Sequence, residues 1–150
     1  AQALLNDPEV LILDEPTSGL DPGERVRFRN LLSEFSKDRI VVISTHIVSD
    51  VEYIANQNTI MKERKIIEND TTEQLVHLVE GKIWECKIPS ADLVKWERTL
   101  KIINLKNEAD GTTAIRYLSD AAETSDSVSV APRLEDLYLW LFPQEGEVSL

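Results

Sequence analysis

Two runs of four consecutive apolar residues, at positions 10–13 and 40–43, are the clearest pattern in the chain. A short unbroken apolar run between turn signals predicts a strand buried on both faces, as in a parallel sheet covered by helices. Between the two runs, residues 23–36 place apolar side chains among charged ones at helical spacing, which predicts an amphipathic helix. We therefore expect an α/β fold in which a helix joins two parallel strands.

The next segment continues the alternation of helices and strands. We expect a short helix at 49–55, strands at 59–61 and 65–67, and a helix at 72–79 with its N-cap at Thr71 or Thr72. The order strand, helix, strand, helix, strand predicts two βαβ units with right-handed crossovers. At the start of the chain, residues 1–5 favour a helix that ends before Pro8.

The pattern changes after Gly81. Residues 83–88 alternate, with Trp84, Cys86 and Ile88 on one face, which predicts a strand with one solvated side. Further expected elements are a helix from Pro89 to about Thr99, strands at 102–105, 113–118 and 127–130, a turn at 107–112, and a helix at 134–142. They indicate a small α+β domain of split-βαβ type. The chain is therefore expected to divide into an α/β part at 1–80 and an α+β domain at 81–150.

Composition and charge narrow the class of protein. The 150 residues are 42% hydrophobic and 29% charged, which is typical of a globular protein. The formal net charge of -11 disfavours nucleic-acid binding, because a phosphate footprint needs clustered Lys and Arg. One cysteine and two distant histidines exclude an internal disulfide and a transition-metal site. The apolar runs are far too short to span a membrane.

Both predicted buried strands end in polar residues. Asp14 and Glu15 follow the first strand, and Ser44, Thr45 and His46 follow the second. In an open α/β sheet, ligands bind beyond the carboxyl ends of the strands. An apolar strand that delivers Asp and then Glu is the Walker B pattern of P-loop ATPases, in which the Asp helps to hold Mg²⁺ and an adjacent carboxylate orients the attacking water. The pattern alone is weak evidence, because acidic turns after strands are common.

The residues around these strand ends carry a more specific resemblance. The run DEPTSGLDP at positions 14–22, followed by Ser-Thr-His at 44–46, resembles the ATP-binding domains of ABC transporters. Within that family DEPTSGLDP resembles Walker B and the D-loop, and STH resembles the H-loop. An unbroken nine-residue match with a correctly placed downstream histidine is specific. The resemblance extends over residues 1–80 and implies part of a P-loop sheet with flanking helices.

The resemblance implies a role for each matching residue, with ATP and Mg²⁺ as the cofactors. Asp14 would be the metal-side carboxylate, and Glu15 would be the general base or water-orienting group for hydrolysis. His46 would contact the γ-phosphate and help to hold the attacking water. The loop that faces the nucleotide site of a partner subunit would contain Ser18, Gly19 and Asp21.

Other motifs of that family do not occur in the sequence. None of the glycines fits the GxxxxGK[ST] pattern of a Walker A loop, and these are Gly19, Gly23, Gly81, Gly111 and Gly146. The glycine-rich signature motif and the glutamine loop are also missing. We therefore expect a C-terminal fragment that starts just after the signature motif, binds ATP weakly and does not hydrolyse it. It should self-associate, because the lost central strand exposes apolar edges.

The end of the chain carries a looser resemblance. Residues 132–138, PRLEDLY, resemble the helix that closes the C-terminal extension of bacterial ABC exporter ATPases. The alternative is a generic α+β domain whose last helix simply belongs to the core.

Three functions remain open from the sequence. The first is the ATP-hydrolysing subunit of a bacterial ABC exporter, which would act as a dimer with a transmembrane permease subunit, in the cytoplasm at the inner face of the cell membrane. The second is a non-transport ABC ATPase of DNA repair or ribosomes, which the acidic charge and the SGLDP sequence disfavour. The third, for the chain by itself, is a non-catalytic dimerisation or regulatory module.

Overall fold

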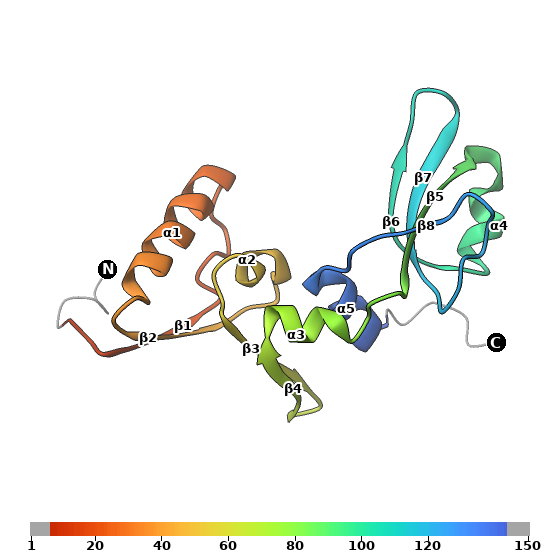
Figure 1. Cartoon of the computed structure of the whole chain (residues 1–150). Coiled ribbons are helices and arrows are strands. Elements are labelled where there is room, and N and C mark those ends of the chain that lie inside the picture. Colours follow the sequence, from red (N-terminus) through yellow and green to blue (C-terminus); the bar gives the residue numbers. More distant parts are fainter. Residues whose placement is uncertain (1–6, 144–150) are drawn as a thin grey trace. The chain divides into compact units, whose positions relative to one another are not determined.

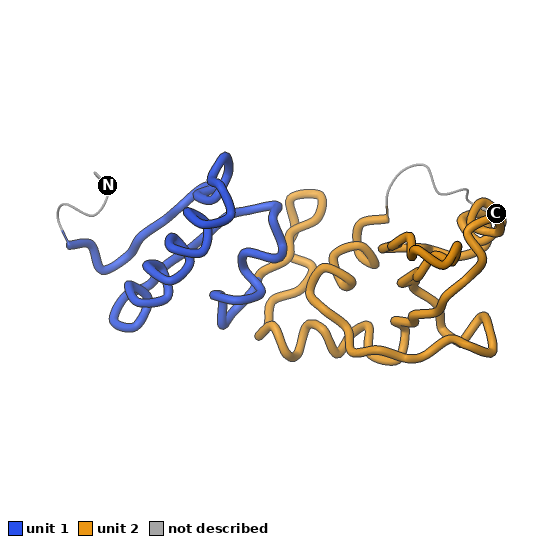
Figure 2. The backbone as a smooth tube through the Cα atoms, turned by 90° about the horizontal axis from the view of Figure 1, so that it is seen from above, with its two compact units in different colours: residues 1–58 blue, residues 59–150 orange. Residues whose placement is uncertain are grey.

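The computed structural model describes residues 7–143, which fall into two compact units. The described residues up to 58 form the first unit, and those from 59 onward form the second (Figure 2). Spatial compactness does not define the extent of an ATP-binding domain, so the expected boundary at residue 80 stays a prediction. The helix expected at residues 1–5 lies outside the described residues.

The first unit contains a two-stranded parallel sheet (Figure 1). The strands β1 (Val10–Asp14) and β2 (Ile40–Ser44) pair from Val10 opposite Ile40 to Asp14 opposite Ser44. The helix α1 (Pro22–Phe35) forms the crossover between them, and the short helix α2 (Val48–Glu52) follows β2. The predicted strand, helix and parallel strand are confirmed, and α2 is shorter than the helix expected at 49–55.

The start of α1 follows from local side-chain chemistry. Asp21 is the N-cap, and its Oδ1 accepts a hydrogen bond from the backbone N–H of Glu24 at 2.9 Å. Pro22 occupies the first turn, where its missing N–H leaves no intrahelical bond unmade. The helix ends at a C-cap on Ser36. These caps fix the point at which the Asp14–Asp21 segment becomes helical.

The strands β1 and β2 are covered on one face only. Leu11 is buried, whereas Val10 and Ile12 on the other face of β1 are 50% and 74% exposed. Ile40 and Val42 pair with them in register and are 62% and 49% exposed. The prediction that these strands are buried on both faces is therefore wrong for the described chain. An apolar run shows that both faces of a strand are apolar, but it does not show what covers them.

The next two strands form a separate hairpin. Within the described residues, β3 (Gln57–Lys62) pairs with β4 (Lys65–Thr71) in a two-stranded sheet and does not join β1 and β2. Glu63 and Arg64, which connect them, have φ angles of 51° and 64°, the left-handed conformation of a tight hairpin turn. The predicted strands are confirmed, but the predicted second βαβ unit is wrong, because β3 pairs with β4 and not with β2, the strand that precedes α2.

The second unit is built on a four-stranded sheet in the order β6-β7-β5-β8. The elements after Gly81 are β5 (Ile83–Pro89), α4 (Leu93–Glu97), β6 (Lys101–Asn107), β7 (Thr112–Leu118), the short β8 (Val128–Ser129) and α5 (Leu134–Leu141). β7 runs antiparallel to both β5 and β6 and lies between them. The strands β5 and β6, joined through α4, are thus split by β7, as the predicted split-βαβ arrangement requires.

One face of this sheet carries a hydrophobic core. Its buried members are Cys86, Ile88, Leu100, Ile115 and Tyr117. Trp84 and Trp96 pack against them, so the alternation predicted for residues 83–88 is confirmed. Cys86 is a free, buried thiol that serves as a small core residue.

The helices of the second unit differ in one respect from the sequence prediction. The helix expected from Pro89 to Thr99 is a 3₁₀ turn at Ser90–Asp92 followed by the short α4. By contrast, α3 (Thr72–His77) is capped by Thr71 and α5 begins at Leu134, both as predicted. Leu75 of α3 and Leu137 of α5 are buried, and the two helices contact each other. Across residues 7–143, the helices are all too short or too polar to cross a bilayer.

Candidate functional site

The carboxyl ends of β1 and β2 bring the candidate chemistry together. Asp14 and Ser44 are partners in the parallel register, and the N–H of Glu15 donates to the carbonyl of Ser44 at 2.8 Å. The Ser44 hydroxyl donates to Oδ1 of Asp14. The two polar strand ends, thirty residues apart in sequence, therefore form one cluster at one edge of the sheet.

Glu15 and His46 are in direct contact in this cluster. Oε1 of Glu15 lies 2.8 Å from Nδ1 of His46 and accepts a hydrogen bond from the His46 backbone N–H at 2.9 Å. Oε2 accepts a hydrogen bond from the Thr45 hydroxyl at 3.0 Å. Since a carboxylate can only accept, Nδ1 carries a proton in this arrangement and Nε2 is left for another partner. Glu15 and His46, which the resemblance assigns to the same reaction, thus contact each other directly in the structure.

The backbone at Glu15 is strained. Its φ angle is +45°, a left-handed conformation that non-glycine residues seldom adopt. The next residue is Pro16, which further restricts the backbone of the residue before it. Strain of this kind costs about 1–3 kcal/mol and persists only where surrounding interactions hold it, and it is common at functional sites. Here the hydrogen bonds from Thr45 and His46 hold the side chain.

The same contacts set the charge of Glu15. The side-chain hydrogen bond from His46 is the main reason that the pKa of Glu15 lies below its ordinary value, with the Thr45 hydroxyl and the His46 backbone as further contributions. The carboxyl group is therefore ionised at neutral pH. An ionised carboxylate with a low pKa is suited to orient a water molecule and stabilise positive charge more than to remove a proton outright.

The metal-side role expected for Asp14 stays a prediction, and the geometry around its carboxylate shows what it could bind. Its carboxylate is exposed at the sheet edge and hydrogen-bonded to Ser44, with both groups supplying oxygen. Residues 7–143 hold no group of three or more His, Cys, Asp or Glu side chains that could enclose a metal. Mg²⁺ is commonly bound by one or two protein oxygens together with water and substrate phosphates, so a single carboxylate beside a hydroxyl is compatible with it.

The structure places the other candidate residues in the turn after Glu15. The backbone N–H of Ser18 donates to the carbonyl of Glu15 at 3.1 Å, and Ser18 and Gly19 are both exposed. Gly19 has a φ angle of +78°, which a side chain at that position would strain. Asp21 is engaged as the N-cap of α1. The turn is thus exposed and geometrically defined, and its role toward a partner subunit stays a prediction.

Thr45 is a site residue to which the sequence prediction gave no role. Its hydroxyl donates to Glu15 and accepts a hydrogen bond from the backbone N–H of Ile47 at 3.1 Å. It thereby links the carboxylate to the segment that carries His46. The signal available in the sequence was its place between Ser44 and His46, since a hydroxyl residue there can reach across to a neighbouring strand end.

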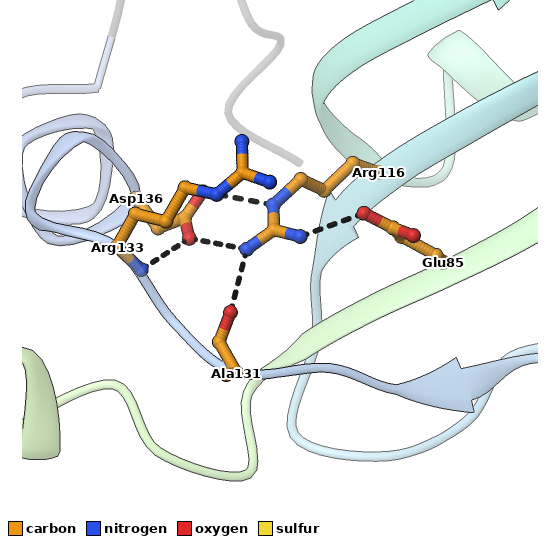
Figure 3. A network of polar contacts seen from close by, with 5 residues as sticks. All are labelled: Glu85, Arg116, Ala131, Arg133 and Asp136. Carbon is orange, nitrogen blue, oxygen red and sulfur yellow. Dashed lines mark hydrogen bonds and ion pairs between the residues drawn. The ribbon is translucent and has the colours of Figure 1, made fainter.

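A second polar network lies in the second unit (Figure 3). The buried Arg116 of β7 donates to both carboxylate oxygens of Asp136, at 3.1 and 2.6 Å, and to Glu85 at 2.7 Å. It also donates to the carbonyl of Ala131, while the N–H of Arg133 donates to Asp136. The Arg116 guanidinium is therefore paired with two carboxylates, of which that of Asp136 is buried and that of Glu85 is half exposed. The network holds α5 against the sheet and accounts for the Asp of the LED sequence.

The chain is similar over much of its length to named transport proteins. It is 35% identical over 117 residues to an uncharacterized ABC transporter ATP-binding protein of Nostoc sp., covering 74% of this chain and 32% of the relative. It is 41% identical over 87 residues to the lantibiotic transport ATP-binding protein SrtF of Streptococcus pyogenes, covering 55% of this chain and 38% of the relative. It is 32% identical over 122 residues to the Nod factor export ATP-binding protein I of Burkholderia lata, covering 80% and 40%.

The chain belongs to the ABC transporter ATP-binding family. No family model matches it. The chain spans about a third of the length of these three relatives, between 32% and 40%. The structure contains a parallel sheet in the first unit and an antiparallel arrangement around β7 in the second. This mixture agrees with the α/β and α+β parts expected from the sequence.

Proposed function

We propose that the intact protein is the ATP-hydrolysing subunit of a bacterial ABC exporter, and that this chain supplies the part of its active site that handles the attacking water. The contact between Glu15 and His46 at the carboxyl edge of β1 and β2 carries the proposal. Each residue matches a different motif of the ABC family, and the two motifs meet at one point. A histidine or a glutamate at a strand end would not by itself support this function.

The reaction is the transfer of the γ-phosphoryl group of ATP to water. The catalytic contribution expected of protein groups in such a reaction is positioning and electrostatic stabilisation. Glu15 accepts a hydrogen bond from the attacking water and orients it toward the phosphorus atom. His46 donates from Nε2 to the γ-phosphate when both of its ring nitrogens are protonated, since Nδ1 donates to Glu15.

Asp14 and Ser44 are the residues of this chain that would hold Mg²⁺ at the phosphates. When bound, the ion would supply positive charge that offsets the charge of the phosphate oxygens. The hydrogen bond from Ser44 engages Oδ1 of the Asp14 carboxylate at the sheet edge.

The remaining parts of the proposal follow from the family. Residues 1–80 would be the C-terminal half of a P-loop ATPase domain, and residues 81–150 the accessory domain of exporter-type ATPases. Ser18, Gly19 and Asp21 would face the nucleotide site of a second ATPase subunit. The protein would be cytoplasmic, and binding to a transmembrane permease subunit would hold it at the inner face of the membrane. Two relatives named for lantibiotic transport and Nod factor export support transport rather than DNA repair.

A second function applies to the chain by itself. The second unit has its own core, with Tyr117 and Ile115 buried, and an ion-paired helix α5. This observation supports independent folding of the second unit, and for the chain by itself the proposed role is a non-catalytic module for dimerisation or regulation. The two proposals are compatible, because the first concerns the intact protein.

The test is ATP hydrolysis by the intact gene product with Glu15→Gln. This variant keeps the shape of the side chain and removes its charge, so hydrolysis should fall by at least about a hundredfold while ATP still binds and ATP-bound dimers accumulate. Glu34→Gln removes an exposed carboxylate from α1 and serves as the matched control, with activity near that of the unmodified protein. Normal hydrolysis by Glu15→Gln would show that Glu15 has no role in the reaction.

A further inference from the structure

Asp50 is a buried carboxylate outside the site described above. It lies in α2, is 2% exposed, and neither of its oxygens has a hydrogen-bond partner among the described residues. An isolated buried carboxylate is costly unless a positive charge lies close to it.

Two arginines of α1 supply that positive charge. Nε of Arg25 lies 3.8 Å from Oδ2 of Asp50, and Nη1 of Arg29 lies 3.9 Å from Oδ1. The arginines are four residues apart, so they project from the same face of α1 and bracket the carboxylate. The guanidinium of Arg29 also lies over the ring of Tyr53, 5.3 Å from its centroid, just beyond the end of α2. Charge therefore holds α2 against α1.

The two helices joined in this way each begin beside a candidate site segment. α1 starts at its N-cap Asp21, at the end of the turn that contains Ser18 and Gly19. α2 starts at Val48, two positions after His46. The Asp50 ion pairs thus connect the segment that carries His46 to the helix that anchors the turn after Glu15.

We propose that Asp50 is a positioning residue, which through Arg25 and Arg29 fixes the His46 segment relative to the turn at Ser18–Asp21. The proposal rests on the proposed function, because it assigns to Asp50 the placement of His46 for ATP hydrolysis. The ion pairs are longer than hydrogen bonds, so the link depends on charge. Replacing Asp50 by a neutral residue of the same shape should therefore loosen it.

The first test measures amide hydrogen exchange by NMR in the 150-residue chain. In Asp50→Asn, exchange of the His46 and Ile47 amides should accelerate by about tenfold or more, because local opening of that segment becomes easier. The amides of Val42 in β2 should change little, which separates local loosening from general destabilisation. Asp50→Glu keeps the charge and should retain most of the protection. Glu34→Gln on the outer surface of α1 is the matched control.

A folded Asp50→Asn chain with unchanged exchange at His46 and Ile47, or with equal acceleration at Val42, overturns the proposal. If circular dichroism shows that Asp50→Asn does not fold, Arg29→Gln replaces it, since that variant leaves Arg25 to neutralise Asp50. Unchanged exchange at His46 in the folded Arg29→Gln chain overturns the proposal in the same way.

The second test measures steady-state hydrolysis by the intact gene product. Asp50→Asn should lower kcat by about tenfold to a hundredfold with KM for ATP nearly unchanged, as misplacement of a reacting group does. If Glu15→Gln abolishes hydrolysis and Asp50→Asn has normal kcat, the inference fails and the proposed function stands. If Glu15→Gln hydrolyses normally, the proposed function fails, whatever the result for Asp50.

Discussion

The guanidinium of Arg116 donates two hydrogen bonds to the carboxylate of Asp136, one from Nε at 3.1 Å and one from Nη2 at 2.6 Å. Both side chains are nearly inaccessible to water, and Asp136 also accepts a hydrogen bond from the N–H of Arg133. The pKa of Arg116 is raised above its ordinary value, chiefly by the hydrogen bonds to Asp136. Asp136, the aspartate of the LED sequence, thus holds α5 against the sheet.

Asp136→Asn should lower the free energy of unfolding by about 3 kcal/mol, because it leaves a buried guanidinium without its main counter-charge. Urea unfolding followed by tryptophan fluorescence measures this change. The double variant Arg116→Met, Asp136→Leu removes both buried charges and should recover much of the loss. A cost below about 0.5 kcal/mol for Asp136→Asn would mean that the pair does not hold α5 in place.

The 150-residue chain should show no detectable ATP hydrolysis by itself. It contains the residues proposed to handle water but no Walker A sequence to bind the phosphates, and positioning of the phosphoryl group is required for the reaction. A phosphate-release assay on the purified chain, with the intact gene product as the positive control, measures this. Turnover by the chain that disappears in Glu15→Gln would contradict the prediction.

The chain should self-associate through the open face of β1 and β2. Val10, Ile12, Ile40 and Val42 form a contiguous exposed apolar surface on the described structure. Apolar patches and unpaired strand edges of this kind promote association. Analytical ultracentrifugation should show oligomers that decrease in the variant Ile12→Lys, Val42→Lys, whereas Glu34→Gln leaves them unchanged. A monodisperse monomer of the unmodified chain at high concentration would rule out this surface as an interface.

The turn between β6 and β7 should make stability depend on pH through Asp110. Its Oδ1 accepts hydrogen bonds from the Thr112 hydroxyl at 2.6 Å and the Thr112 N–H at 3.0 Å, which hold the pKa of Asp110 below its ordinary value of 3.8. A lowered pKa in the folded state stabilises the protein above the ordinary value, and the stabilisation is lost as the pH falls through the folded-state pKa.

Asp110→Asn keeps the accepting oxygen and removes the charge, so it isolates this effect. The unmodified chain should be the more stable of the two at about pH 6, and the difference should shrink below about pH 4. Urea midpoints of both chains at several pH values measure the difference. If the difference is independent of pH, the charge of Asp110 contributes nothing to the turn.

The sequence predicted most elements because their determinants are local. The apolar runs that became β1 and β2, the alternation in β5, and the cap at Thr71 depend on residues within a few positions of one another. The second βαβ unit was not predicted correctly, because strand pairing is not a local property. The sequence indicated β3 as a strand, but it did not indicate that β3 pairs with β4 and not with β2.

The candidate site was predictable in its residue types but not in its contacts. The motifs placed Asp14, Glu15 and His46 at strand ends, and the parallel register then brought them together. The hydrogen bond from Thr45 to Glu15, and the burial of Asp50 between two arginines, depend on side chains from different elements. No local pattern encodes such distances.

The sequence alone determined where the chain forms strands and helices, and which polar residues lie at the strand ends. Backbone propensity, capping and hydrophobic periodicity, which decide these features, act over short distances along the chain. Only the tertiary structure decided which face of the β1–β2 sheet is covered, which strands pair, and that Asp136 and Asp50 are buried charges. Those properties depend on the packing of elements that are distant in the chain, since burial and charge pairing are fixed by neighbours in space.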